Sequence, residues 1–385
     1  MKQLLSLFLA LLIGVSQTFA ATNPLNQGKL NDSIYNYVRN GSFWFAQRQV
    51  PGTLTTYSST GGRAGSADGW YITNENASAQ YQRTDTSGAA ESGLQAQFYG
   101  NFTKITSTGK LEVSQVLPSV DTCLIRGRTV RITCYMKQLV ASAPVIRLGL
   151  IQLTSSGTVD TIPATFISAH GANGTDPTLG TNLSYIVPTA GLLTENATIT
   201  GNAASCTLSA SWQKFSACFL VPTNCKNLVV MLWSNNQLAA TNGFAVSQVE
   251  LSDSYNFQDY SPESYDQEYG RCSRYIGKTF NVDTGPIQNA GAGTGEFRFQ
   301  AGTVGALGDF GWYQFPVRMR IAPTVTTYNP AVGNAQVRDI TAAADCSAVA
   351  TTVATETGVM ITATGNASTA VGNKLGVHLL LDADL

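Results

Sequence analysis

A regular alternation of apolar and polar positions in residues 129–138 predicts a half-buried strand. In this segment, TVRITCYMKQ, the side chains of Val130, Ile132, Cys134 and Met136 fall on one side of an extended chain. The intervening positions carry threonine, arginine, tyrosine and lysine. A period of two is typical of an antiparallel strand with one face on a core and the other toward solvent.

Other short apolar segments predict further strands of the same kind. Residues 145–153 and 227–234 are apolar at nearly every position, as expected of central strands that are covered on both faces. Residues 212–222 and 244–253 complete this set. Residues 154–205 are rich in threonine, glycine and asparagine and weakly patterned, so we expect large loops or an inserted hairpin there.

Residues 261–280, SPESYDQEYGRCSRYIGKTF, carry the one convincing pattern of a soluble helix. Ser261 is a suitable N-cap, and Pro262 is a suitable first helical residue. Acidic side chains lie early in the segment and basic ones late, which complements the helix dipole. The sequence therefore predicts a helix from about Pro262 to Ile276, and the dipole explains its charges without a binding role.

One stripe of this predicted helix is apolar or aromatic. Spacings of four, three and four residues place on it Tyr265, Tyr269, Cys272 and Ile276. A helix of about 15 residues is marginal alone in water, so its stripe needs a packing partner. The heptad-like spacing favours packing against copies of the same helix, and the C-terminal part of the chain is the alternative partner.

The order of these patterns defines the expected domain organisation. The ranges are a leader at 1–20, a polar arm at 21–39, a β-sandwich at 40–253, a linker helix at 254–280 and a C-terminal β-rich domain at 281–385. The clearest strands of the last range are YQFPVRMR and TVTTY. The expected fold class is therefore all-β with one short linking α-helix.

Composition and charge narrow the function. The chain has 385 residues, of which 12% are charged, and its formal net charge is −1. Phosphate binding needs clustered lysine and arginine, so this balance argues against a nucleic-acid partner. Lys2, an apolar run and the pair Thr18 and Ala20 form the pattern of a secretory signal peptide that is cleaved after Ala20. A short N-terminal membrane anchor is the alternative.

Seven cysteines follow this leader: Cys123, Cys134, Cys206, Cys218, Cys225, Cys272 and Cys346. Some could pair in an exported protein, and the odd number leaves at least one without an intramolecular partner. Their spacing lacks the close pairs of a zinc site, so we expect no structural metal.

The sequence offers no catalytic constellation and implies no cofactor. Its two histidines are His170, in a polar loop where we expect it to be solvated, and His378, on a terminal strand. A serine triad would need one of them beside an activated serine, and neither GxSxG nor HExxH occurs. Paired carboxylates brought together by the fold remain the open alternative. We expect a protein that is not an enzyme.

Aromatic side chains among polar neighbours are the remaining candidates for a site. Sugars present flat apolar faces that stack on exposed rings, while their hydroxyl groups bond to nearby polar side chains. The candidate carbohydrate-binding residues are Tyr57, Trp70, Tyr71, Tyr81, Tyr99 and Trp233. Tyr57 lies in the loop-like LTTYSSTGG and is the best exposed candidate, whereas a place in the core is the alternative for Trp70 and is also expected for Trp212.

Two resemblances complete the sequence-based picture. The order NGSF, ADGW, WQKFSACFLVP and FAVSQVELSD is similar to the jelly-roll, carbohydrate-binding-module-like domains of the CenC type. EYGRCSRYIGKTF, followed by FPVRMRIAPTVT and a terminal LLLDADL, resembles bacteriophage tail-fibre or head-fibre proteins. In those proteins a helix links an N-terminal jelly roll to a C-terminal β domain. Ser247 and Gln248 stand where the related modules often place a calcium-binding aspartate, so no calcium site is assigned.

The resemblances imply a structural and attachment protein of a virion. Its expected partners are a glycan on the host or cell surface, other virion proteins and two further copies of itself, because such fibres are commonly homotrimers. The expected location is the virion. The alternative is a secreted or periplasmic bacterial carbohydrate-binding or adhesin-like protein, which the signal sequence favours.

Overall fold

A computed structural model describes most of the chain from residue 35 onward. The described ranges are 35–49, 54–57, 64–76, 78–86, 94–154, 156–163, 165–192, 194–253, 260, 262–302, 308–346 and 348–384. The predicted signal peptide, most of the predicted arm and the predicted N-cap Ser261 lie outside these ranges. The chain divides into a unit of residues 1–35 and a unit of residues 36–385, and the second unit contains all the described helices and strands.

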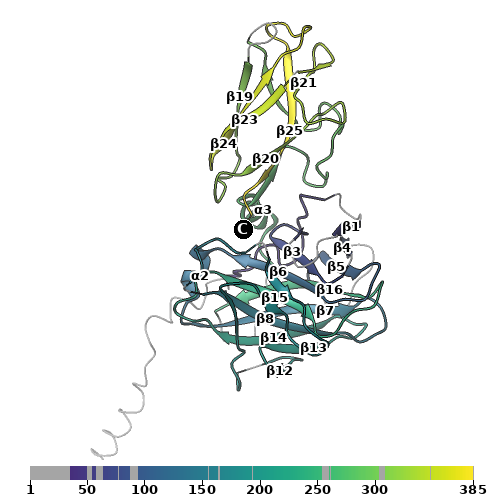
Figure 1. Cartoon of the computed structure of the whole chain (residues 1–385), viewed down its shortest axis with the longest axis vertical. Helices are drawn as coiled ribbons and strands as arrows, with labels where there is room; N and C mark the ends of the chain where they lie inside the picture. Colours follow the sequence, from purple (N-terminus) through teal and green to yellow (C-terminus); the bar gives the residue numbers. More distant parts are fainter. Residues whose placement is uncertain are drawn as a thin grey trace, which may run out of the picture. The chain divides into compact units, whose positions relative to one another are not determined.

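Most of the described strands of residues 55–252 form two antiparallel sheets (Figure 1). The first sheet has the order β1 (Thr55–Tyr57), β4 (Ala79–Asp85), β5 (Phe98–Lys104), β16 (Gly243–Ser252), β7 (Thr129–Gln138) and β14 (Gln213–Leu220). The second has the order β12 (Thr198–Thr200), β13 (Ala203–Thr207), β8 (Val145–Leu153), β15 (Leu228–Ser234), β6 (Leu111–Leu117), β3 (Trp70–Asn74) and β2 (Ala64–Gly65). In the second sheet, β11 (Leu183–Ile186) also pairs with β8.

The connectivity of these sheets is that of a jelly roll. Strands β5 to β8 alternate between the sheets, β13 stays beside β8, and β14 to β16 alternate again. The first sheet thus contains the row β5, β16, β7, β14, and the second contains the row β6, β15, β8, β13. The first and last strands of this set, β5 and β16, are neighbours in one sheet. This pairing is expected of a jelly roll, which consists of two Greek keys. The predicted all-β sandwich is confirmed.

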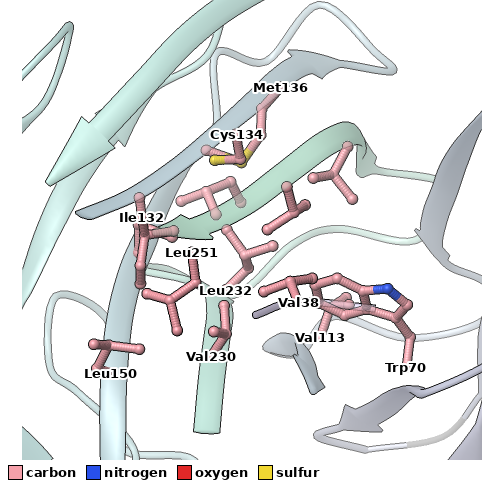
Figure 2. Packing of buried hydrophobic residues seen from close by; sticks show 14 of the residues in the cluster. Val38, Trp70, Val113, Ile132, Cys134, Met136, Leu150, Val230, Leu232 and Leu251 are labelled. Carbon is pink, nitrogen blue, oxygen red and sulfur yellow. The ribbon is translucent and has the colours of Figure 1, made fainter. Parts of the chain in front are cut away.

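The sandwich core lies between the two sheets (Figure 2). Strand β7 contributes Val130, Ile132, Cys134 and Met136, all buried, as its alternating sequence predicts. Segment 154–186 contains the short strands β9 (Ile167–Ala169) and β10 (Thr178–Leu179) besides β11, and its apolar side chains pack in a separate cluster with the outward side chains of the second sheet. The predicted loops of this segment therefore cover a sheet face.

The C-terminal strands are arranged around β25 (Lys374–Asp382), which pairs with β17 (Ile276–Lys278), β18 (Phe297–Gln300), β20 (Thr324–Tyr328) and β21 (Arg338–Asp339). Strand β21 also pairs with β22 (Ala344–Asp345). A second group of strands has the order β19 (Gly308–Gln314), β24 (Gly358–Thr364) and β23 (Ala348–Ala354). Their inward side chains form a hydrophobic cluster distinct from that of the sandwich.

The acidic end of the chain contacts the sandwich sequence through ion pairs. The guanidinium of Arg48 lies 3.0 Å from the carboxylate of Asp382 and 3.2 Å from that of Asp384. The guanidinium of Arg39 lies 3.9 Å from the carboxylate of Asp384. It also stacks over Tyr275, with its carbon 3.7 Å from the ring centroid. The carboxylate of Asp384 is thus engaged by two sandwich arginines.

The predicted linker helix is shorter than expected and begins later. Helix α3 spans Tyr265–Ser273, whereas Pro262 lies outside it. Ser264 is the N-cap and forms a capping box with Gln267. The side-chain oxygen of each residue accepts from the backbone N–H of the other. The other helix of the described ranges, α2, spans Ser119–Ile125. Neither has the length or apolar character for a membrane crossing.

The predicted four-residue helical stripe is wrong for Ile276, whereas its packing against other copies of the chain stays a prediction. Ile276 belongs to strand β17, because the helix ends at Ser273. The rings of Tyr265 and Tyr269 contact Phe45 of the same chain, at centroid distances of 4.9 and 5.4 Å. Cys272 is buried. Part of the stripe therefore packs within its own chain, while Tyr265 is still 48% exposed.

Replacing Ser264 with alanine should lower the free energy of unfolding by about 1 kcal/mol, because the loss of the capping box would leave helix amides without a partner. Ser264→Asp is the matched control, since aspartate also accepts from the first-turn amides. Urea unfolding of both variants measures the effect. Equal losses in the two variants would show that the cap does not stabilise the fold.

Burial also decides the state of several cysteines. Cys134, Cys206, Cys225 and Cys272 are buried free thiols, and Cys123 is an exposed one. Burial raises the pKa of Cys225 to about 12, which keeps this thiol protonated and unreactive at neutral pH. None of these five residues forms the disulfide that the sequence left open.

Candidate functional site

Three of the six predicted carbohydrate-binding residues are core residues. The side chains of Trp70, Tyr81 and Trp233 are fully buried. Trp70 stacks on Phe43 with ring centroids 5.2 Å apart, and its indole N–H donates to the carbonyl oxygen of Asn40 at 3.1 Å. A ring without an exposed face cannot stack on a sugar, so the prediction is wrong for these three residues.

The other three predicted residues are separated from one another. Tyr57, expected in an exposed loop, is half-buried in edge strand β1, where its hydroxyl accepts from the Gln49 amide. Tyr71 is buried on the outward face of the second sheet. Tyr99 lies on the outward face of the first sheet and packs edge-on against Trp212, with centroids 5.2 Å apart. The six residues do not form one site.

The two histidines are both mostly buried. His170 does not lie in solvent, because its Nδ1 is 2.7 Å from a carboxylate oxygen of buried Glu112. Burial raises the pKa of Glu112, and the hydrogen bond with His170 opposes that effect. His378 lies on strand β25 as expected, where it contacts the hydroxyl groups of Thr279 and Thr294. Burial lowers the pKa of His378, so its ring is neutral at pH 7.

Exposed aromatic rings gather on strand β19 instead. Phe310 is 68% exposed and Trp312 is 46% exposed, the former value being the highest among the exposed large apolar side chains of the described residues. Residues two apart on a strand point to the same face, and their Cα atoms are separated by about 6.6 Å. We call Phe310, Trp312 and the next outward residue, Gln314, the β19 strip.

The inward side of β19 explains why the strip faces outward. On that side Tyr313 and Phe315 pack with the rest of the C-terminal core. A β-carbon at Gly311 would lie 2.7 Å from the ring of Phe299, so the backbone here sits directly on a core ring. Across the ladder, Val359 and Ile361 of β24 are buried, while Met360 and Thr362 stand opposite Trp312 and Phe310.

Trp312 is held in a fixed position at the surface. A β-carbon at residue 358 would lie 2.5 Å from a carbon of its six-membered ring, so the absence of a side chain at Gly358 lets the indole rest on the backbone. The indole N–H donates to the side-chain oxygen of Gln314 at 3.2 Å. A ring fixed on one side and exposed on the other is a preorganised stacking surface.

A depression of about 410 Å³ lies beside the turn between β23 and β24, which contains Glu356. It is lined by Arg274, Val317, Arg318, Met319, Arg320 and Glu356, which we call the arginine depression. The backbone N–H of Met319 donates to the carbonyl oxygen of Glu356 at 2.8 Å. Glu356 lines the depression and lies two residues before Gly358, on which the Trp312 ring rests. At most about 7 Å of backbone therefore separates the two residues.

This arrangement can bind a ligand that has both apolar faces and polar groups. The strip supplies two rings and an amide, and the depression supplies guanidinium donors around an apolar floor. Among the lining residues, all in the described part of the chain, Glu356 is the one carboxylate, and it is paired with Arg318. Hydrolysis of a glycoside by paired carboxylates needs a second one.

The described residues also contain no group of three or more His, Cys, Asp or Glu side chains placed to hold a metal ion.

Sequence reasoning missed the strip because the segment DFGWYQF is apolar on both faces. Phe310 and Trp312 alternate with Tyr313 and Phe315 after Gly311, so period-two analysis cannot tell which side is buried. A useful signal was present: two large rings separated by a glycine, on a strand whose opposite face already carries aromatic residues.

Comparison with known proteins gives weak matches of overall structure. No family model matches the sequence, and no curated protein matches it. Among solved structures, the enzymatically active domain of tailspike protein 4 of bacteriophage CBA120 is 11% identical, with a TM-score of 0.29. That match covers 56% of this chain and 21% of the tailspike chain, so this chain spans about a fifth of that structure.

Two smaller structures are matched over nearly their whole length. The C-terminal family 22 carbohydrate-binding module of Clostridium thermocellum Xyn10B is 10% identical, with 55% of this chain and 94% of the module covered and a TM-score of 0.29. A sugar-binding protein of Bacteroides thetaiotaomicron, whose assignment as such is provisional, is 12% identical, with coverages of 57% and 99% and a TM-score of 0.25. TM-scores below 0.5 do not establish a common fold, and the jelly-roll assignment rests on strand connectivity.

Proposed function

We propose that this protein binds a glycan and does not cleave it. The observation that carries the proposal is the β19 strip, in which Trp312 rests on Gly358 and presents its other face to solvent beside Phe310. Exposed apolar groups that lie side by side, as these two rings do, are typical of a surface that a ligand or partner covers. The amide of Gln314 and the nearby arginines favour a ligand with hydroxyl groups over an apolar one.

The proposed setting is the surface of a virion, where the protein would act as a fibre or decoration that attaches to host glycan. The resemblance of residues 268–280, 315–326 and 379–385 to phage fibre proteins supports this setting. Other virion proteins are then partners, and a homotrimer is the expected assembly. Because Tyr265 and Tyr269 of helix α3 already contact Phe45 of their own chain, the contacts between copies would also need surfaces outside this helix.

The second candidate is a secreted or periplasmic bacterial carbohydrate-binding protein, which the signal-like residues 1–20 favour. The two settings share the same glycan-binding chemistry. Genes for capsid and tail proteins next to this gene would support the virion, and mature protein that begins at Ala21 would support export.

Prolonged incubation of the full chain with a bound polysaccharide should produce no new reducing ends. The expected result follows from the lining of the arginine depression, where Glu356 is the one carboxylate and is paired with Arg318. A reducing-sugar assay measures it, with a commercial hydrolase of the same polysaccharide as the positive control. Sustained release that a Glu356→Gln variant abolishes would make the protein an enzyme.

A further inference from the structure

The arginine depression carries an excess of positive charge. Its lining contains three arginines and one glutamate, so its formal charge is +3 − 1 = +2, within a chain whose net charge is −1. Its volume of about 410 Å³ is within the range of about 300–1,000 Å³ that is usual for small-molecule sites. The depression is thus both large enough for a sugar residue and selective by charge.

The three guanidinium groups differ in what already binds them. Arg320 donates to the carbonyl oxygens of Ala383 and Asp384 at 3.2 and 3.3 Å, contacts that orient its charge without neutralising it. Arg318 pairs with Glu356 in an exposed setting. The exposed side chain of Arg274 forms no hydrogen bond or ion pair within the described ranges. Two of the three charges therefore remain without an ion-pair partner there.

Three carboxylates near these arginines lie outside the depression, and two of them interact with its arginines electrostatically. Burial opposes ionisation of Asp160, but hydrogen bonds from Asn227 and Ser119, with the charge of Arg320, hold the pKa of this carboxyl below its usual value. Burial raises the pKa of Asp121, and the charges of Arg39, Arg271 and Arg274 oppose that effect. At the chain end, Asp384 pairs with Arg48. None of the three carboxylates is among the residues that line the depression.

We infer that the arginine depression binds the carboxylate of an acidic sugar residue, of the uronic or ulosonic acid class, while a neighbouring residue of the same glycan stacks on the β19 strip. Guanidinium groups match carboxylates because their planar donors can form two parallel hydrogen bonds. Val317 and Met319 supply an apolar floor for the carbon face of the sugar ring.

The inference rests on the proposed function and specifies its ligand. The hairpin between β23 and β24 connects the two parts, because Thr357 accepts from the backbone N–H of Phe315 at 2.8 Å and Gly358 lies under Trp312. A glycan chain that crosses this hairpin tip would contact the rings and the arginines at once.

The test is a glycan array that pairs sialylated and uronic-acid glycans with their asialo and carboxyl-reduced counterparts. The wild-type full chain should retain the carboxylated members and bind their neutral counterparts at least about tenfold more weakly, which is the effect of losing one charge-assisted contact. The double variant Arg274→Gln, Arg318→Gln should lose this preference.

The matched control is the double variant Arg128→Gln, Lys374→Gln, which removes the same charge from surfaces elsewhere. Arg128 belongs to the sandwich, where it pairs with Asp253. Lys374 begins strand β25, and Asp382 ends it about 26 Å away. Arg320 contacts Ala383, which follows Asp382, so Lys374 is far from the arginine depression. This control should keep the preference, and thermal unfolding should show that both double variants are folded.

Three results would overturn the inference. Wild-type protein that retains neutral and carboxylated members equally would contradict it while leaving glycan binding intact. Retention of the carboxylate preference by the variant that lacks Arg274 and Arg318 would place the selectivity elsewhere, and retention of sulfated glycans alone would exclude the carboxylate. Failure of the wild-type protein to retain any glycan would instead contradict the proposed function.

Discussion

Replacing Trp312 with alanine should weaken glycan binding about 10- to 30-fold and leave the thermal stability of the protein nearly unchanged. Truncation of an anchoring tryptophan commonly costs about 2 kcal/mol of binding free energy, and about 1.4 kcal/mol corresponds to tenfold. The ring is 46% exposed and packs on one side only, so its loss should cost the fold little. Titration calorimetry with a glycan retained by the wild-type protein measures the affinity.

Three further variants make this prediction specific. Trp312→Phe keeps a flat ring and should retain most of the affinity. Gly358→Ala adds a methyl group where the indole rests, so it should displace the ring and weaken binding although it removes no ligand contact. Val371→Ala shortens another exposed apolar side chain and should change nothing. Equal affinity of the Trp312→Ala variant and the wild-type protein would exclude the strip as the binding surface.

Replacing Trp70 with alanine should lower the free energy of unfolding by about 3–5 kcal/mol, the usual cost of removing a buried tryptophan. The cavity would open between the sheets where the indole stacks on Phe43. The carbonyl oxygen of Asn40 would also lose a donor, although it still accepts from the backbone N–H of Phe43 at 3.0 Å. Urea unfolding, followed by circular dichroism, measures the loss.

Trp70→Phe is the matched variant, because phenylalanine fills most of the space and should lose less stability than alanine. This prediction separates a core residue from a ligand-binding one. A Trp70→Ala variant with wild-type stability and reduced affinity for glycan would show that Trp70 binds the ligand.

The strands of the sandwich could be predicted because the apolar positions in each strand's own sequence match its buried positions. Strand β7 alternates, and its apolar positions are the ones that pack in the core. Strand β15 is apolar at all but its last position, and the structure covers it on both faces, by the sandwich core and by the segment 154–186. A strand buried on one face alternates apolar and polar residues, and a strand buried on both faces is apolar at nearly every position.

The limits of helix α3 depended on contacts that are distant in sequence. Tyr265 and Tyr269 fit a helical stripe whether they pack on another copy or on Phe45, which lies more than 200 positions earlier. Ile276 fits the same stripe, yet pairing of β17 with β25 makes it a strand residue. Local spacing cannot distinguish these outcomes, because the competing hydrogen bonds come from the far end of the chain.

The candidate site was missed for a related reason. Large aromatic residues favour both cores and stacking surfaces, so composition alone pointed to Trp70 and Trp233 as readily as to Trp312. The distinction is made by the sheet to which each strand belongs. Strands β3 and β15 have both faces covered, whereas one face of β19 is exposed.

A glycan array probed in parallel with the wild-type full chain and with the folded double variant Phe310→Ala, Trp312→Ala tests the central claim most directly. We expect the wild-type protein to retain a defined group of glycans and the variant, with unchanged thermal unfolding, to lose them. Retention of the same glycans by both proteins would contradict glycan binding at this surface, because the binding residues would then lie outside the β19 strip.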